Sequence, residues 1–500
     1  MAPKNISKSR FLAGLQCDKH LWLELYRPDI KDAFSESTEA RFEQGNIVGG
    51  YARLLYPNGV LIEDDYLHTV QAIQSTGKAA TSGVNDLYEA TAKTNRFTAR
   101  ADILHRVKKG GDEWDMIEVK STLDPKDEHL LDLTFQKYVF EGAGYKIRKT
   151  FICHLNRDYT RQGPIDIQAL FILSDQTAAV NRLLKDLPLT LKRLTKVAEA
   201  EKEPTVPIGP YCDDPYECPF KGHCWKDVPE KSVFSLAGKK PFVWDLYKKG
   251  IKKLVDIPDT TKLSGAQRKQ IAAERTGKTS WKLPAIQSFL DSLVYPLSFL
   301  DFESFALAIP PYDGMSPLNY IPCQFSLHII KKPGDETEHL EFLGDGHHDP
   351  RVTFSETLLK ALPPKGSILI YSPYEKRILR ETAAFLPKFK PSFNAIIERC
   401  VDLAVPFQKR DVVHPEFEGR YSIKYVLPAL VPSMSYDDLA IGEGGAAVDA
   451  YLQLMDPNVS ETAKKQIRKD LLEYCGYDTM AMVKLVEILT SKVRSNSLRK

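Results

Sequence analysis

The amino-acid sequence predicts an α/β protein with more than one domain. Apolar and polar residues alternate, as in half-buried strands, in two distant parts of the chain, and helix-like segments follow each part. The 500 residues suffice for two to four domains of about 100–200 residues each. With 43% hydrophobic and 27% charged residues, the composition is typical of globular proteins and excludes a disordered or fibrous class.

Charge and cysteine content narrow the possible partners. Lys and Arg total 68 and Asp and Glu total 66, so the net charge of +2 does not by itself indicate nucleic-acid binding. No apolar run approaches the roughly 18 residues of a membrane span, so we expect a cytoplasmic protein that does not contact a membrane. Eight cysteines are too few for a disulfide scaffold, although three of them share one short segment.

The first domain is predicted over residues 1–228. It opens with helices from Ser7 to about Pro57, followed by a strand at Gly59–Glu63. Period-two alternation then predicts a β-hairpin, in which a glycine-containing turn joins two strands. The hairpin strands are Phe97–Leu104 and Trp114–Lys120, and the later elements are a helix at Asp127–Gly142, a strand at Lys149–Leu155 and a helix at Ser174–Glu201.

The rest of the chain divides into a connector and a second α/β domain. Residues 229–290 are lysine-rich, and LYKKGIKKLVDIP predicts a helix, a glycine turn and a second short helix, in the manner of a helix-hairpin-helix. Residues 291–500 form the second domain, which ends in a long helix from about Ser460 to Val493. Its predicted strands are 296–303, 323–330, 339–344 and 367–372, and a further helix begins at Pro373.

The predicted hairpin carries the first candidate catalytic site. Glu118 and Lys120 lie two residues apart on a strand and therefore share a face, and Asp102 lies on the neighbouring strand. Two carboxylates can hold Mg²⁺ or Mn²⁺, while the lysine positions a water or stabilises charge on a phosphate. The alternative is a hairpin whose charges simply face solvent; a following helix with Gln136 favours the catalytic interpretation.

These residues resemble the RecB-like branch of the PD-(D/E)XK nucleases. RADIL supplies the aspartate, IEVKS supplies the E-x-K core, and FQKYVF resembles the glutamine-bearing helix, although Phe140 stands where the branch often has tyrosine. Members commonly take a further metal ligand, often histidine, from an early helix, where this chain offers Glu43 or Asn46. Glu89 is another candidate acidic ligand; the alternative is an ordinary exposed glutamate.

Cys212, Cys218 and Cys224 form a C-x₅-C-x₅-C pattern that lacks the short knuckles of structural zinc sites. Cys17, in the helical N-terminal segment, is the natural fourth thiol. One N-terminal and three C-terminal cysteines around such a core resemble the iron–sulfur nucleases, which include CRISPR-associated adaptation exonucleases and AddB-type subunits. The resemblance implies a 4Fe-4S cluster that clamps the two ends of the domain; zinc and free thiols are the alternatives.

The second candidate site combines a strand and a helix. Asp301 and Glu303 lie two residues apart on a strand, and Tyr474 and Asp478 lie one helical turn apart, although each pattern is common by itself. Together they resemble the tyrosine-containing variant of the DnaQ-like, DEDD-type exonucleases, which have an RNase H-like fold. The resemblance implies two metal ions bridged by these carboxylates, with the tyrosine hydroxyl orienting the attacking water.

A middle carboxylate and a phosphate contact remain open in this second site. The DnaQ-like family has an aspartate after a central strand, where this chain offers Glu375; Asp402 is the alternative. Lys424 lies between the motifs and either meets a phosphate or is an exposed lysine.

The whole chain resembles a bacterial family of two-nuclease proteins. The expected function is metal-dependent hydrolysis of DNA, single-stranded or from ends, at two sites. The preference for DNA comes from the resemblance, and RNA stays open. The alternative is a nucleic-acid-binding module with decayed sites, which the missing histidine near Asn46 and the glutamate at position 375 favour, and which the two otherwise complete acidic sets oppose.

Overall fold

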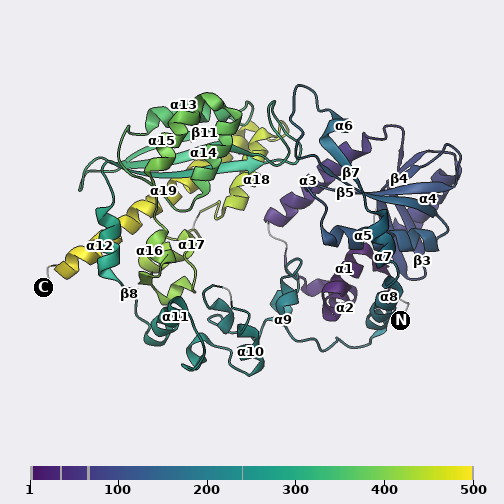
Figure 1. The fold of residues 1–500 in the computed structure, drawn as a ribbon, viewed down its shortest axis with the longest axis horizontal. Helices are drawn as coiled ribbons and strands as arrows, with labels where there is room; N and C mark the ends of the chain where they lie inside the picture. Colours follow the sequence, from purple (N-terminus) through teal and green to yellow (C-terminus); the bar gives the residue numbers. More distant parts are fainter. Residues whose placement is uncertain (1–3, 34–35, 65–67, 239, 438, 498–500) are drawn as a thin grey trace. The chain divides into compact units, whose positions relative to one another are not determined.

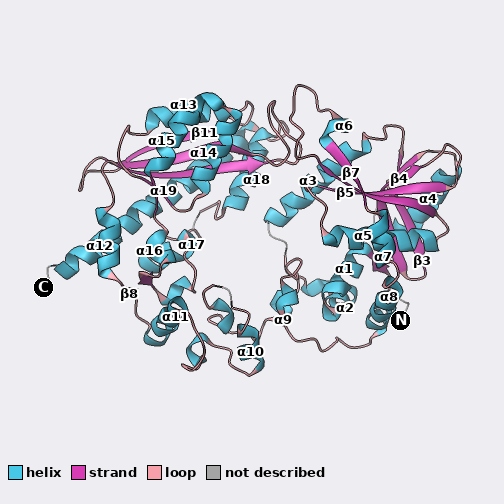
Figure 2. Cartoon of the chain, viewed as in Figure 1, coloured by secondary structure: helices cyan, strands magenta, loops and turns pink. Residues whose placement is uncertain are grey.

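The computed structural model describes residues 4–33, 36–64, 68–238, 240–437 and 439–497. The chain forms two compact units, and each contains a sheet flanked by helices, so the predicted α/β class is confirmed (Figure 2). The first unit is Met1–Asp227 with Leu307–Leu318, and the second is Val228–Ala306 with Asn319–Lys500. The predicted connector therefore belongs to the second unit, and a loop of the predicted second domain belongs to the first.

The first unit is built on a mixed sheet with strand order β2-β3-β4-β5-β6-β7, and β1 pairs with β4. Strands β3, β4 and β5 form an antiparallel meander that contains the predicted hairpin, whereas β5 and β6 are parallel. The strands are β1 (Ile6–Ser7), β2 (Val60–Leu61), β3 (Asp86–Thr94), β4 (Phe97–Arg106), β5 (Glu113–Lys120), β6 (Lys146–Leu155) and β7 (Phe171–Asp175).

Helices cover both faces of this sheet. Helix α5 crosses from β5 to β6 and packs on the core that contains Trp114 and Met116, while Ile117 belongs to the core on the other face, with Val48 of α3. The helices are α1 (Lys8–Gln16), α2 (Asp18–Tyr26), α3 (Glu36–Arg53), α4 (Thr69–Thr81), α5 (Asp127–Gly142), α6 (Ile167–Leu170), α7 (Thr177–Leu183), α8 (Leu187–Glu199) and α9 (Lys221–Cys224).

One expectation for the first unit was wrong, one strand is shorter than predicted, and two elements were not predicted. The predicted helix at Ser174–Glu201 is instead the end of β7 followed by α7 and α8, because the Asp175 side chain accepts from the Thr177 N–H just before α7 and Pro188 lies in the first turn of α8. The predicted strand at Gly59–Glu63 is only two residues long. Helix α4 and strand β3 were not predicted at all.

The second unit contains a sheet with strand order β11-β10-β9-β12-β13 and a separate pair, β14-β8. Strands β11, β10 and β9 are antiparallel, and β12 and β13 continue the sheet in parallel. The strands are β8 (Ser280–Trp281), β9 (Leu297–Ala306), β10 (Tyr320–Ile330), β11 (Glu338–Leu343), β12 (Ile368–Ile370), β13 (Cys400–Asp402) and β14 (Val412–Val413).

Helices α13 and α19 cover opposite faces of this second sheet (Figure 1). On β10, Phe325 packs against Phe354 of α13, and the next residue, Ser326, bonds to Thr479 of α19. The helices are α10 (Val243–Lys248), α11 (Gly265–Thr276), α12 (Leu283–Asp291), α13 (Arg351–Ala361), α14 (Tyr374–Phe385), α15 (Lys390–Arg399), α16 (Val405–Gln408), α17 (Ile423–Leu430), α18 (Gly444–Met455) and α19 (Glu461–Ser497).

The connector has the predicted helix, glycine turn and short helix. Helix α10 ends at Lys248, and Gly250 follows the C-cap with a left-handed φ of 83°, while the Ile251 N–H bonds back to the Leu246 carbonyl. A single 3₁₀ turn at Leu254–Asp256 follows, and α11 completes a small apolar core. Across both units, none of the helices within the described ranges is long and apolar enough to cross a membrane.

Gly366 packs directly against the backbone of Pro296, the residue before β9. We predict that Gly366→Ala strongly destabilises the second unit. Its φ is +95°, and an added Cβ would lie 2.1 Å from the Pro296 carbonyl oxygen. Left-handed strain alone costs about 1–3 kcal/mol, and the overlap adds to it. Gly334→Ala is the matched control, because Gly334 has φ +90° but open space around it. Denaturant unfolding of both variants is the measurement; equal losses would contradict the prediction.

Candidate functional site

The second unit brings three acidic side chains to one partly buried position. Asp301 and Glu303 project from β9 toward α19, since their register partners Ser326 and Gln324 on β10 both bond to that helix. Carboxylate oxygens of Asp301, Glu303 and Asp478 all lie within 4.8 Å of one another. Within the described part of the chain, no other three acidic, histidine or cysteine ligand atoms are this close together.

Helix α19 supplies Asp478 and, one turn earlier, Tyr474. The Tyr474 hydroxyl bonds to the Asp478 carboxylate, and the Tyr436 hydroxyl donates to Asp478 Oδ1 at 2.5 Å. Burial raises the pKa of Asp478 to about 6, although both tyrosine hydroxyls favour its charged form. Burial and repulsion from Asp478 raise the pKa of Asp301 and Glu303 well above the usual range.

Glu375 is the fourth carboxyl group of this cluster. It lies in the first turn of α14, is 3% exposed, and its Oε2 atom has no hydrogen-bond partner among the described residues. Its charge raises the pKa of both Asp301 and Glu303. Burial, followed by repulsion from Asp402 and Asp478, raises its own pKa to about 8. An unpartnered buried carboxylate oxygen of this kind is available to a bound cation.

Asp402, the alternative to Glu375, lies at the end of β13 beside it. Its carboxylate accepts a hydrogen bond from the Ala404 N–H at 2.9 Å, which caps the following turn. Glu375, rather than Asp402, is among the charges that act on Asp301 and Glu303. The structure therefore brings Glu375 closer to the cluster than Asp402.

Tyr436 was not predicted from the sequence, and the role of Lys424 was left open. Tyr436 lies in an irregular segment before α18, so no periodicity marks it. Lys424 on α17 donates to the Gly442 carbonyl at 2.8 Å, and its positive charge favours the ionised forms of Glu303 and Asp478. Lys424 is therefore a partly buried cation beside the carboxylates rather than a solvated lysine.

The first unit places Glu118 in the centre of a polar network beneath α5. Glu118 is 1% exposed, and its Oε1 atom accepts from Lys120 Nζ at 2.7 Å and from Lys8 Nζ at 2.8 Å. Gln136 of α5 donates to Glu118 Oε2 at 2.5 Å. Although burial opposes ionisation, the two ammonium groups lower the pKa of Glu118 below its usual range. Lys8 was not predicted from the sequence.

Asp102 and Glu118 come directly after the last register pair of β4 and β5, Ile103↔Ile117, and their charges repel each other. Asp102 Oδ2 accepts from the Val119 N–H at 2.6 Å. Burial and repulsion from Glu118 raise the pKa of Asp102 to about 7. Asp132, one turn before Gln136 on α5, also was not predicted; it accepts from Lys120 Nζ at 2.6 Å.

Glu89 is held by arginines. It lies opposite Asp102 in the β3–β4 register, with a left-handed φ of 56° that interrupts the ladder. Its carboxylate lies 2.8 Å from Arg53 Nη2 and 3.9 Å from Arg100 Nη1. Asp102, Glu118 and Glu89 do not converge as tightly as the second unit's carboxylates. The other candidates, Glu43 and Asn46, are exposed on α3.

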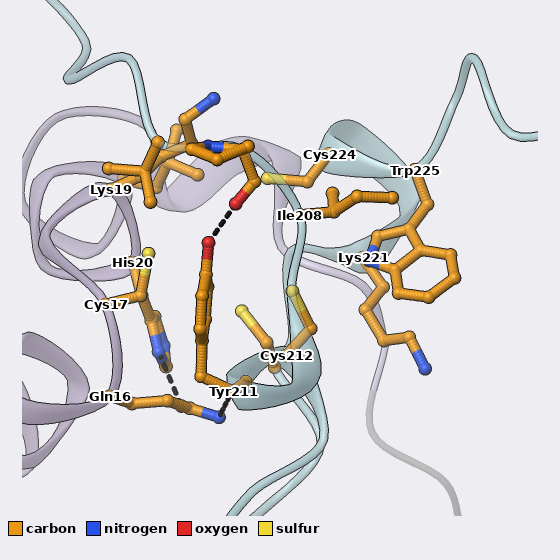
Figure 3. A pocket seen from close by; sticks show the side chains of 14 residues that line it. Gln16, Cys17, Lys19, His20, Ile208, Tyr211, Cys212, Lys221, Cys224 and Trp225 are labelled. Atoms are coloured by element: carbon orange, nitrogen blue, oxygen red, sulfur yellow. Dashed lines mark hydrogen bonds between the residues drawn. The ribbon is translucent and has the colours of Figure 1, made fainter. Parts of the chain in front are cut away.

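Cys17, Cys212, Cys218 and Cys224 line a single pocket (Figure 3). Burial raises the pKa of the Cys218 thiol to about 12 and also raises the pKa of Cys17 and Cys224. Backbone N–H groups favour the thiolate form of two of them: His20 and Lys19 donate to Cys17, and Phe220 donates to Cys218. No three of the four sulfurs lie within 4.8 Å of one another.

The chain is similar to one protein family and to two bacterial proteins whose descriptions name no activity. A family model described as a domain of unknown function (DUF2779) matches residues 298–422, a stretch that includes Asp301, Glu303 and Glu375. An uncharacterised protein of Ureaplasma parvum is 27% identical over 208 residues, which is 37% of this chain and 30% of that protein. One of Mycoplasma genitalium is 23% identical over 218 residues, 40% of this chain and 33% of that protein. The chain thus spans about a third of the length of these relatives.

We predict that the metal-free protein loses stability as the pH rises. Glu375 and Asp478 have pKa values of about 8 and about 6, above the ordinary values of about 4.3 and 3.9. Between about pH 4 and 8 these two groups therefore hold more protons in the folded state than in the unfolded state, and their contribution to the free energy of unfolding falls as the pH rises. Thermal unfolding at several pH values, with and without Mn²⁺, measures this.

Mn²⁺ should restore stability more at about pH 8 than at pH 5, because ligand carboxyls must lose their protons to bind it. Glu375→Gln should flatten the pH dependence, since the amide cannot titrate. A thermal unfolding midpoint of the second unit that changes with neither pH nor Mn²⁺ would contradict the prediction.

Proposed function

We propose that this chain is a metal-dependent nuclease that hydrolyses phosphodiester bonds of DNA at two separate sites. The observation that supports this best is the group of three carboxylate oxygens, from Asp301, Glu303 and Asp478, within 4.8 Å of one another in a partly buried position. Buried like charges at this distance repel strongly unless a cation is bound or protons are taken up. A Mg²⁺ or Mn²⁺ ion, which prefers carboxylate oxygens, fits this donor set.

The residues of the second unit can serve a hydrolytic step. Divalent ions bound there would neutralise phosphate charge and acidify an attacking water. Asp301, Glu303, Glu375 and Asp478 are the ligand candidates, which agrees with the resemblance to DnaQ-like exonucleases. The Tyr474 hydroxyl can orient the water, and the Lys424 ammonium can offset charge that develops on the phosphate.

The first unit supports a second nuclease site of the RecB-like type. Asp102 and Glu118 supply carboxylates, Lys120 lies between Glu118 and Asp132, and Gln136 fixes the other oxygen of Glu118. Lys120 is positioned to hold a water or to stabilise phosphate charge. For Glu89 to bind a metal ion as a third ligand, its carboxylate would have to leave its arginine partners.

The cysteine pocket supports an iron–sulfur cluster as a structural clamp. A tetrahedral zinc with Zn–S bonds of about 2.3 Å would hold all four sulfurs roughly 3.8 Å apart, whereas no three of these sulfurs lie within 4.8 Å of one another. N–H groups directed at sulfur are also a feature of iron–sulfur sites. Cys17 would then connect the start of the unit to Cys212, Cys218 and Cys224 at its end.

Two other functions remain as outcomes of the tests. A nucleic-acid-binding module without activity is favoured by the arginine-paired Glu89, and RNA is an alternative substrate because no described side chain reports on a 2′-hydroxyl. Digestion of labelled single- and double-stranded DNA and RNA, with Mg²⁺ or Mn²⁺, separates these possibilities.

We predict two separable nuclease activities. Asp301→Ala should abolish cleavage at the second site, and Glu118→Ala should abolish cleavage at the first, each by on the order of 10²-fold or more, because each change removes a ligand of one site only. Single-turnover digestion of end-labelled single-stranded DNA by the two variants and the double variant is the measurement. Asp402→Asn is the matched control for the second site, since Asp402 lies beside Glu375 but outside the cluster.

Complete retention of cleavage by the double variant would show that neither site is catalytic. Loss of cleavage in Asp402→Asn, with full activity in Glu375→Gln, would show that Asp402 is the middle ligand.

We predict that anaerobically purified protein is brown and contains about four irons, with a broad absorption near 400 nm. Cys218→Ala should lose the iron and destabilise the first unit while the second unit stays folded, because the clamp acts within its own unit. Cys400→Ala, in the second unit, is the control and should keep the iron. Stoichiometric zinc in colourless protein would contradict the prediction.

A further inference from the structure

Helix α1 touches both the Glu118 carboxylate and the cysteine pocket. Its first residue, Lys8, places its ammonium 2.8 Å from Glu118 Oε1. Cys17 follows its last residue as the C-cap, with the Cys17 N–H bonded to the Ala13 carbonyl. At about 1.5 Å per residue, this helix spans roughly 13 Å. One short rigid element therefore connects the two features.

The end of α1 is attached directly to the cysteine-bearing loop. The Gln16 side-chain amide donates to the carbonyls of Tyr211 at 2.8 Å and Tyr216 at 2.6 Å. These two tyrosines flank Cys212 and precede Cys218 in the sequence. Figure 3 shows Gln16, Cys17 and Tyr211 together at the pocket. Any movement of this loop is therefore transmitted to the last turn of α1.

The body of α1 is fixed by close packing. Phe11 stacks on Phe135 with ring centroids 4.5 Å apart, and Phe135 precedes Gln136, the donor to Glu118. A Cβ at Gly14 would lie 2.6 Å from Leu194 Cδ2, so α1 and α8 approach closely. These contacts allow α1 to act as a unit rather than to bend between its ends.

Lys8 neutralises a ligand carboxylate that already has one lysine. The Glu118 side chain is 1% exposed, and Lys8 and Lys120 share its Oε1 atom. A second ammonium at this place makes the site less negative and so weakens its attraction for a divalent cation. It also fixes the orientation of Glu118 before a metal ion binds.

We propose that α1 couples the cysteine cluster to the carboxylate site by holding Lys8 on Glu118, so that an intact cluster keeps Glu118 oriented and the metal affinity moderate. This inference rests on the proposed function. Lys8 is a positioning residue, because it acts through Glu118. Loss of the cluster loosens the last turn of α1, and because α1 moves as a unit the contact between Lys8 and Glu118 weakens, so that the site binds a divalent cation more tightly.

The first experiment measures Mn²⁺ binding without substrate, by electron paramagnetic resonance of full-length protein carrying Asp301→Ala to disable the second site. Lys8→Met should tighten Mn²⁺ binding by about tenfold, since a unit positive charge leaves the site. Lys8→Arg, which keeps the positive charge, should bind Mn²⁺ with the same affinity as the protein with Lys8. Lys4→Met is the matched control: Lys4 lies over the Tyr26 ring at 5.3 Å and should have no effect.

The second experiment tests the coupling through α1. Removing the cluster, by Cys218→Ala or by mild oxidation of folded protein, should tighten Mn²⁺ binding in the same direction, and Lys8→Met should add nothing further. Additive effects would overturn the coupling, and unchanged affinity in Lys8→Met would overturn the role of Lys8. If no variant binds Mn²⁺ at this site, the proposed function of the first unit fails together with the inference.

Discussion

Four carboxyl groups are buried side by side in the second unit, and their mutual repulsion constrains the structure around them. Asp301 and Glu303 come from β9, Glu375 from α14 and Asp478 from α19, so three separate elements carry like charge to one place. Burial alone raises the pKa of each group, and the neighbouring charges raise most of them further. Tyrosine hydroxyls and one lysine offset only part of this, so the arrangement is stable with protons or with a cation.

In the first unit, lysine side chains offset the repulsion between the acidic groups. Lys8 and Lys120 already neutralise Glu118, and Asp132 takes a further bond from Lys120. The carboxylates there are consequently less dependent on an external ion than those of the second unit. The two sites are therefore expected to differ in metal affinity, even though the proposed chemistry is the same.

The parts of the sites that follow chain periodicity were predictable from the sequence. Alternation placed Asp301 and Glu303 on one face of β9 and Glu118 and Lys120 on one face of β5, and helical spacing joined Tyr474 to Asp478. The missed residues have no such signal.

Each missed residue depends on tertiary packing or irregular backbone. Tyr436 lies in an irregular segment, and Lys8 reaches Glu118 across 110 residues of chain. Strand β3 was missed because half of its six buried residues are alanine or threonine, and the left-handed Glu89 breaks its pattern.

Calorimetry of Mn²⁺ binding to the full-length protein near pH 6.5, in buffers of different ionisation enthalpy, tests the central claim most directly. The account predicts protons released as the metal displaces them from the buried carboxyls, and a weaker release in Asp301→Asn; binding without proton release, unchanged by that substitution, would contradict it.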